Sequence, residues 1–171
     1  MKKLIAIVFL LISLSYSKDK ISIANILKSS FSEDIRIEKK KFTLSNKEVK
    51  SIQKTAKAKL RLRAVHIFEV KENNTTVGNA VLIKQRIRTR NANILYITDA
   101  NDKIKSIEVL SFGEAEEYRP NKKWQKMLEG KSREDELTVG EDLALITGAT
   151  MSVKSLASAT RIALAILAIK D

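Results

Sequence analysis

Residues 65–110, VHIFEVKENNTTVGNAVLIKQRIRTRNANILYITDANDKIKSIEVL, carry the strongest secondary-structure signal in the chain. Apolar residues recur there at alternate positions, which is typical of strands with one buried face. Asn73-Asn74 and the polar residues 99–102 have the composition of tight turns. We therefore predict an antiparallel meander, with a strand that contains Val65, Ile67 and Val70 followed by strands over residues 77–90, 94–98 and 104–110.

The segment before this meander has a helical pattern and then an extended one. Apolar residues within 21–31 have helical spacing, and residues 35–44 follow as a short extended stretch. Ser45 and Glu48 form a capping-box signature, which predicts a helix that runs to about residue 59.

Two further helices are expected after the meander. A short one covers residues 122–128 and ends at Gly130, and a long one covers residues 152–169. The long helix has a single apolar stripe at Val153, Leu156, Thr160, Ala163 and Leu167. These patterns predict an α+β fold, in which helices pack on one face of an antiparallel β-meander sheet and a long C-terminal helix comes last.

The composition excludes several classes of function. The chain has 171 residues, a formal net charge of +12, one histidine and no cysteine. Disulfides, thiolate metal sites and cysteine nucleophiles are therefore excluded. With 44% apolar and 30% charged residues, we expect a small soluble domain rather than a disordered chain or a protein with many membrane spans.

The N-terminus has the pattern of a secretory signal. Lys2 and Lys3 precede an apolar run over residues 4–12, and serines follow it. This run is shorter than the roughly 20 residues that a membrane-spanning helix needs. We predict export to the periplasm or to the extracytoplasmic face of a membrane. The chain would then divide into a signal peptide, an N-terminal helix with an extended segment, and a main domain, over residues 1–17, 18–45 and 46–171.

Basic residues alternate along the strand predicted over residues 77–90, so Lys84, Arg86, Arg88 and Arg90 would share one face. This row is either an anion site or a solvated strand face. The predicted export argues against nucleic acid as a partner, as does the lack of aromatic residues between the cations. Contact of the basic surface with anionic headgroups of a membrane, or with an acidic protein, fits the charge better.

Other candidate residues have ordinary structural interpretations. His66 has no second histidine or cysteine with which to share a metal, so we expect a structural role. Trp124 and Tyr118 are expected to pack in the core or at its rim. An acidic trio follows the last predicted strand, at Glu114, Glu116 and Glu117. Its carboxylates could perform acid-base chemistry, or they could be solvated charges of a loop.

Residues 145–152, LITGATMS, lie at the start of the final helix. Backbone N–H groups at a helix start lack intrahelical partners and carry the positive end of the helix dipole, which attracts phosphate. Three hydroxyls would lie at the mouth of this site, the open start of the helix, from Thr147, Thr150 and Ser152. From these residues alone, the segment is either a phosphate site or a plain Ser/Thr N-cap after a glycine turn.

Together with its surroundings, this segment resembles the FMN-binding domain family, which includes the C subunit of sodium-pumping NADH:quinone reductase and the G subunit of the Rnf electron-transport complex. In that family a [Ser/Thr]-Gly-Ala-Thr-x-[Ser/Thr] motif carries FMN through a phosphoester to its last threonine. Thr150 matches that acceptor position. Residues 87–90 and 112–120 are also similar to a subfamily, and the likeness spans roughly residues 46–171.

The resemblance implies a cofactor site at the helix start. It assigns FMN binding to the motif residues Thr147, Gly148, Ala149, Thr150 and Ser152. It also implies that three further residues lie at the flavin pocket, namely Glu114, Tyr118 and Arg88. No metal and no separate catalytic residue is implied.

Two positions depart from the family pattern. The aspartate six residues before the acceptor, which is thought to help the flavin transferase and its metal, is Ala144 here, whereas the other acidic position is kept as Asp142. A proline of the upstream stretch is Ala115. The first departure bears directly on covalent attachment.

The resemblance implies an exported flavoprotein that transfers electrons as a carrier or small subunit of a redox chain, rather than an enzyme with its own turnover. Its partners would be a flavin transferase and a membrane-associated or soluble redox protein. One alternative is a non-redox docking protein that keeps the fold without flavin. A second alternative is a reductase with noncovalent FMN.

Overall fold

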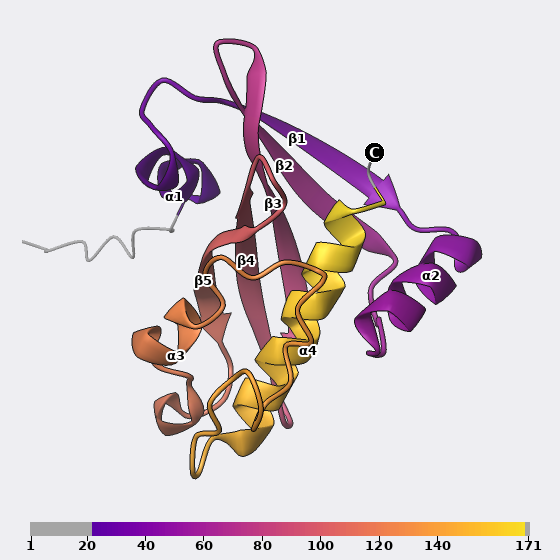
Figure 1. The fold of residues 1–171 in the computed structure, drawn as a ribbon, viewed down its shortest axis with the longest axis vertical. Helices are drawn as coiled ribbons and strands as arrows, with labels where there is room; N and C mark the ends of the chain where they lie inside the picture. The colour runs from indigo at the N-terminus through magenta and orange to yellow at the C-terminus, as the bar shows by residue number, and fades with distance from the viewer. Residues whose placement is uncertain (1–21, 170–171) are drawn as a thin grey trace, which may run out of the picture.

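A computed structural model describes residues 22–169, so the signal peptide predicted over residues 1–17 lies outside the described residues. One antiparallel sheet has the strand order β1-β2-β3-β4-β5, in which each strand pairs with its neighbours in the sequence (Figure 1). The predicted meander is confirmed. The strands are β1 Arg36–Thr43, β2 Ala64–Glu72, β3 Thr75–Arg86, β4 Asn91–Asp99 and β5 Ile104–Phe112.

Within the described residues, four α-helices and one short 3-10 helix accompany the sheet. They are α1 Ile23–Ser30, α2 Asn46–Ala56, η1 Glu116–Tyr118, α3 Lys122–Lys126 and α4 Thr150–Leu167. The α+β class with a long C-terminal helix is therefore confirmed. Within residues 22–169, no helix has the length and apolar character needed to cross a membrane.

The turns between β2 and β3 and between β4 and β5 lie where the sequence predicts them, and both have ordinary turn chemistry. Asn73 and Asn74 adopt left-handed φ values of 47° and 66°, which a two-residue turn of the type favoured in hairpins requires. In the second turn, a carboxylate oxygen of Asp99 accepts hydrogen bonds from the N–H groups of Asn101 at 2.9 Å and Lys103 at 3.0 Å. Both turns thus follow from local sequence.

β3 ends at Arg86, before the end that the alternating pattern predicts. Residues 87–90 form a turn, in which the N–H of Ile87 donates to the carbonyl of Arg90 at 2.9 Å. The prediction that Arg88 and Arg90 continue one strand face with Lys84 and Arg86 is therefore wrong. Alternation of residue types continues through the turn, but its backbone does not pair as a strand.

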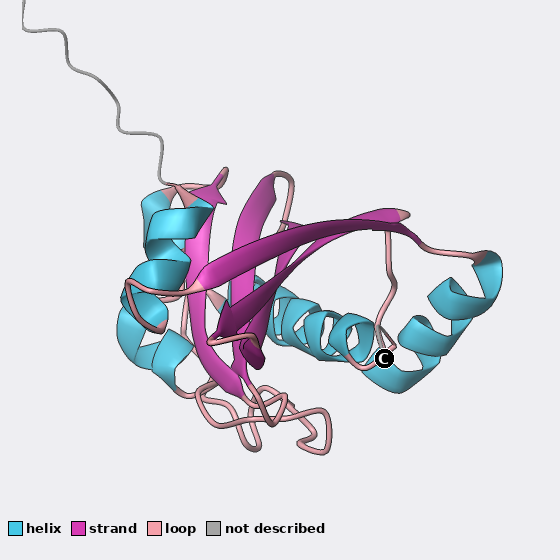
Figure 2. Cartoon of the chain, turned by 90° about the horizontal axis from the view of Figure 1, so that it is seen from above, coloured by secondary structure: helices cyan, strands magenta, loops and turns pink. Residues whose placement is uncertain are grey.

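Hydrophobic clusters lie on both faces of the sheet, whereas the sequence pattern indicated one covered face. The larger cluster joins one face to α2, α3 and α4, and it includes Tyr96, Trp124 and Leu156. On the other face α1 packs through Leu27 against a smaller cluster that includes Phe68 (Figure 2). The helical spacing within 21–31 predicted α1 but did not specify the face that it covers.

The capping box of α2 is confirmed. The Ser45 side chain accepts from the N–H of Glu48 at 3.3 Å, and the Ser45 N–H donates to the Glu48 carboxylate at 2.7 Å. The helix ends at Ala56 because Lys57 adopts a left-handed φ of 47°. The Nε of Arg161 in α4 then donates to the free carbonyl of Ala56 at 2.8 Å, which fastens α2 to α4.

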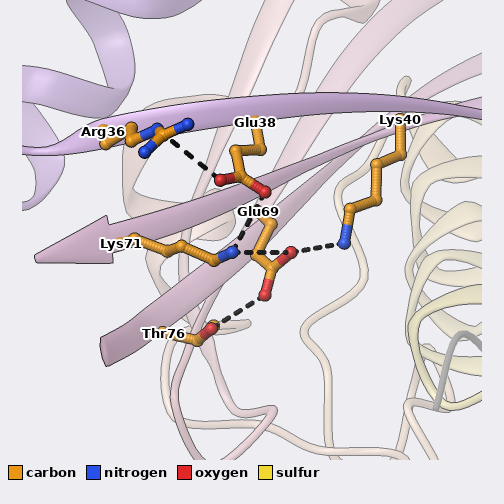
Figure 3. Close-up of polar contacts among 6 residues, drawn as sticks. All are labelled: Arg36, Glu38, Lys40, Glu69, Lys71 and Thr76. Atoms are coloured by element: carbon orange, nitrogen blue, oxygen red, sulfur yellow. Dashed lines mark hydrogen bonds and ion pairs between the residues drawn. The ribbon is translucent and has the colours of Figure 1, made fainter. Parts of the chain in front are cut away.

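A network of charged side chains joins β1 to β2 and β3 (Figure 3). Glu38 and Glu69 lie directly opposite each other in the paired strands, an arrangement that destabilises a sheet when it is not neutralised. The Nζ of Lys71 lies 3.0 Å from a carboxylate oxygen of Glu38 and 3.8 Å from one of Glu69, and Lys40 donates to Glu69 at 2.6 Å. Hydrogen bonds from Lys40 and Thr76 lower the pKa of Glu69 to about 2.

Glu69→Gln is expected to weaken the dependence of stability on pH. The folded pKa of about 2 lies below the ordinary value of 4.5, so the charged carboxylate contributes stability that is complete above about pH 5 and is lost as the pH falls toward 2. We expect the variant to lose about 1–2 kcal/mol of unfolding free energy at neutral pH, and roughly half as much at about pH 3.

Urea unfolding at the two pH values measures this difference. The control is Glu33→Gln, because Glu33 is 83% exposed and its ion pair with Lys28 is 3.5 Å long. The control should change the unfolding free energy by no more than about 0.3 kcal/mol. An equal loss for Glu69→Gln at neutral and acid pH would contradict the assignment of the effect to its charge.

Candidate functional site

The start of α4 is open and lacks a side-chain cap. Gly148 has a φ of 82°, and a Cβ added there would meet no atom within 4 Å. Ala149 is the N-cap, and the first bond of the helix runs from the N–H of Val153 to the carbonyl of Ala149 at 3.1 Å. The N–H groups of residues 150–152 therefore have no acceptor within the helix and present the positive end of its dipole.

The three hydroxyls of the motif differ in their environments. Thr147 is exposed, whereas Thr150 is half-buried and its Oγ1 donates to the carbonyl of Ile146 at 3.3 Å. Ser152 is fully buried, and its Oγ has no hydrogen-bond partner among the described residues. The expectation of three hydroxyls at the mouth is therefore corrected, because α4 begins at Thr150 and its first turn directs Ser152 inward.

Trp124 holds the segment that leads into the motif. Its indole Nε1–H donates to the carbonyl of Ala144 at 2.6 Å, and its side chain is buried in the larger cluster. Asn121 caps α3 by accepting from the N–H of Trp124 at 2.9 Å. The packing role predicted for Trp124 is confirmed, and the structure adds a direct connection to the motif segment.

The acidic residue that the motif keeps is engaged in its own loop. The carboxylate of Asp142 accepts from the N–H groups of Leu137 at 2.9 Å and Thr138 at 2.5 Å. Ala144, which replaces the family aspartate, is exposed. Asp142 thus holds the loop at residues 137–138 through these two hydrogen bonds.

Glu114 holds the turn between β3 and β4. Its Oε1 accepts from the N–H groups of Arg88 at 3.2 Å, Thr89 at 2.6 Å and Arg90 at 2.7 Å. These backbone hydrogen bonds, that of Arg90 most strongly, hold the pKa of Glu114 below its usual range. The carboxylate explains why β3 stops, since it takes up the N–H groups that a longer strand would need.

The same turn connects η1 to α4. The guanidinium of Arg88 lies over the ring of Tyr118, with its Cζ 4.4 Å from the ring centroid. The hydroxyl of Ser155, in the second turn of α4, donates to the carbonyl of Ile87 at 3.0 Å. Glu114, Tyr118 and Arg88 are therefore brought together, and Ser155 connects their turn to the helix that begins at Thr150.

Family comparison agrees with the motif. Residues 91–165 match the model of the FMN-binding domain family. This match begins with β4 and ends within α4, so it includes Glu114, Tyr118 and the whole motif. The part of the chain from 91 to 165 is an FMN-binding domain, and its cofactor is FMN. No curated protein and no solved structure matches the chain.

The start of α4 fits the phosphate of FMN. A phosphate oxygen accepts hydrogen bonds, and this end of the helix offers N–H groups without intrahelical partners. Gly148 leaves open space in front of these groups, and the first turn of α4 contains no acidic residue that would repel an anion.

Proposed function

We propose that the chain is an exported flavoprotein that holds FMN through Thr150 and passes electrons as a carrier or small subunit of a redox chain. The observation that carries the proposal is Thr150 itself. It occupies the acceptor position of the motif, inside the region of the family match, and it is the first residue of an uncapped helix. The FMN, once bound, accepts and donates electrons.

A flavin transferase would attach the cofactor at this position. The bond that forms joins Oγ1 of Thr150 to phosphorus, and the hydroxyl proton passes to water. The bond that breaks joins the same phosphorus to the leaving group of a phosphate-activated flavin donor. The hydroxyl must release its hydrogen bond to Ile146 to react, which is a small change because that bond is 3.3 Å long.

The other residues of the site position and tune the cofactor. The N–H groups of residues 150–152 bind the phosphate, and Glu114 fixes the shape of the turn that carries Arg88. Arg88 keeps its orientation by packing on Tyr118, and it supplies a positive charge at the turn between β3 and β4.

Flavin retention and reversible reduction test the proposal. Protein exported in a host with a flavin transferase should keep its yellow colour through acid precipitation, and its flavin should bleach on reduction and recover on reoxidation. Flavin that is released by denaturation into a filtrate would indicate noncovalent FMN. Colourless protein from the same host would contradict the proposal.

Ala144→Asp is expected to raise the flavinylated fraction. It restores the carboxylate of the family motif at an exposed position, while Asp142 remains engaged with Leu137 and Thr138. Matched coexpression with the transferase and measurement of flavin per chain test this. Complete flavinylation of the wild-type chain, or no increase from a low starting fraction, would show that the missing carboxylate does not limit attachment.

Arg88→Gln is expected to lower the flavin midpoint potential more than Lys84→Gln does. A cation beside the flavin favours its anionic reduced form, and a cation held against a ring acts more strongly than one screened by water. Both side chains are exposed, but Arg88 packs on the ring of Tyr118 beside the candidate site, whereas Lys84 lies within β3, before the turn. Redox titration of both variants at the same salt concentration decides this. Equal shifts of the midpoint potential would show that Arg88 does not lie beside the flavin.

A further inference from the structure

A basic groove runs along α4 beside the turn that carries Arg88. It has a volume of about 300 Å³ and lies between three segments: the residues after α2, the end of β3 with its turn, and the middle of α4. Its floor includes Ile87 and Ile162, which are nearly buried. The cations that line it are Lys59, Arg61, Arg86 and Arg88.

No carboxylate lines the groove, and Glu114 bonds the backbone N–H of Arg88 rather than its guanidinium. The lining of the groove contains no acidic residue, and none of the four cations forms an ion pair with another described residue. Two other hollows of similar size differ in this respect, since Glu136 lines one and Asp102 and Glu134 line the other. The groove thus gathers four cations that form no ion pair among the described residues, on a chain whose net charge is already +12.

The positions of these cations are partly fixed. The Nε of Arg86 donates to the carbonyl of Arg88 at 3.2 Å, and Arg88 packs on Tyr118 at 4.4 Å. All four side chains are exposed, so they reach a partner without rearrangement of the core. Such pre-organised cations lose less side-chain entropy when carboxylates bind to them.

The groove is next to the candidate cofactor site. Its lining includes Ser158, one helical turn beyond Ser155, whose hydroxyl bonds the carbonyl of Ile87. An electron carrier needs a partner to approach close to its cofactor, and complementary charge accelerates and orients such encounters. We propose that this groove docks an acidic protein surface, that of the redox partner, beside the flavin; this inference rests on the proposed function.

A glutamate-rich peptide tests the groove without any flavin. The groove variant is Lys59→Gln, Arg61→Gln and Arg86→Gln together, which leaves Arg88 in place. The matched control is Lys41→Gln, Lys50→Gln and Arg133→Gln, which removes the same charge from exposed positions outside the groove. Binding is measured on the flavin-free chain at low salt, with vesicles of phosphatidylglycerol as a second probe.

We expect the groove variant to bind the peptide about tenfold more weakly than wild type, and the control to bind within about threefold of wild type. Equal weakening in both variants would show that net charge alone attracts the peptide and would overturn the proposal. The proposal would also be overturned if the groove variant weakened vesicle binding but left peptide binding unchanged. That result would assign the groove to contact with a membrane. Because the chain carries no flavin in this assay, either result leaves the proposed function to be judged separately.

Discussion

Thr150→Val is expected to remove covalently bound flavin while the fold remains. Valine has nearly the same shape as threonine but lacks the hydroxyl that would form the ester. The hydrogen bond from Oγ1 to Ile146 is 3.3 Å long, so we expect its loss to cost less than about 1 kcal/mol of unfolding free energy. Flavin absorbance after acid precipitation, together with thermal unfolding, measures both effects.

Thr147→Val is the control for this variant. Thr147 lies in the same motif and is exposed, but it is not the acceptor position. The control should retain most of its covalent flavin. Full flavinylation of Thr150→Val would place the ester elsewhere and would refute the assignment of the acceptor.

Glu114→Gln is expected to loosen the turn between β3 and β4. The carboxylate accepts three backbone hydrogen bonds there, and an uncharged amide, which also presents donors, cannot replace them all. We expect the unfolding free energy to fall at neutral pH, because these N–H groups lose a charged acceptor. Because the pKa of Glu114 is lowered in the folded chain, this contribution is present above its unfolded pKa and declines as the pH falls.

Amide hydrogen exchange locates the effect of this substitution. The N–H groups of Arg88, Thr89 and Arg90 should exchange more than about tenfold faster in Glu114→Gln than in wild type. Glu117→Gln is the matched control, because Glu117 is exposed in the same acidic trio. Unchanged protection at residues 88–90 would show that Glu114 does not hold the turn.

The strands could be predicted because their determinants are local. Alternating apolar residues and the Asn73-Asn74 turn are visible in the sequence and define the hairpin of β2 and β3. The end of β3 could not be predicted in the same way, because it depends on Glu114, which lies beyond the next two strands. Residue alternation gives no information about such a distant acceptor.

The covering of the second sheet face depends on a contact that is also distant in sequence. A Cβ at Gly78 would collide with the ring of Phe31 and with the carbonyl oxygen of Thr98. The glycine in β3 therefore allows the residue that follows α1 to approach the sheet. Glycine within a strand indicates a close approach, but the sequence does not identify the group that approaches.

The candidate site was only partly predictable. The resemblance selected Thr150, and the family match includes that position. The bonds from Trp124 to Ala144 and from Ser155 to Ile87 were missed, since each joins residues that are separate in sequence and carry no shared pattern. The sequence pattern places Ser152 at the start of the final helix, whereas α4 begins two positions earlier, at Thr150.

Intact mass with peptide mapping is the most direct test of the flavin assignment. The protein should be expressed and exported together with a flavin transferase, and then purified without denaturation. We expect the mass of one FMN on each mature chain, carried by the peptide that contains Thr150. An unmodified Thr150 peptide from protein exported with an active transferase would contradict covalent attachment at the start of α4.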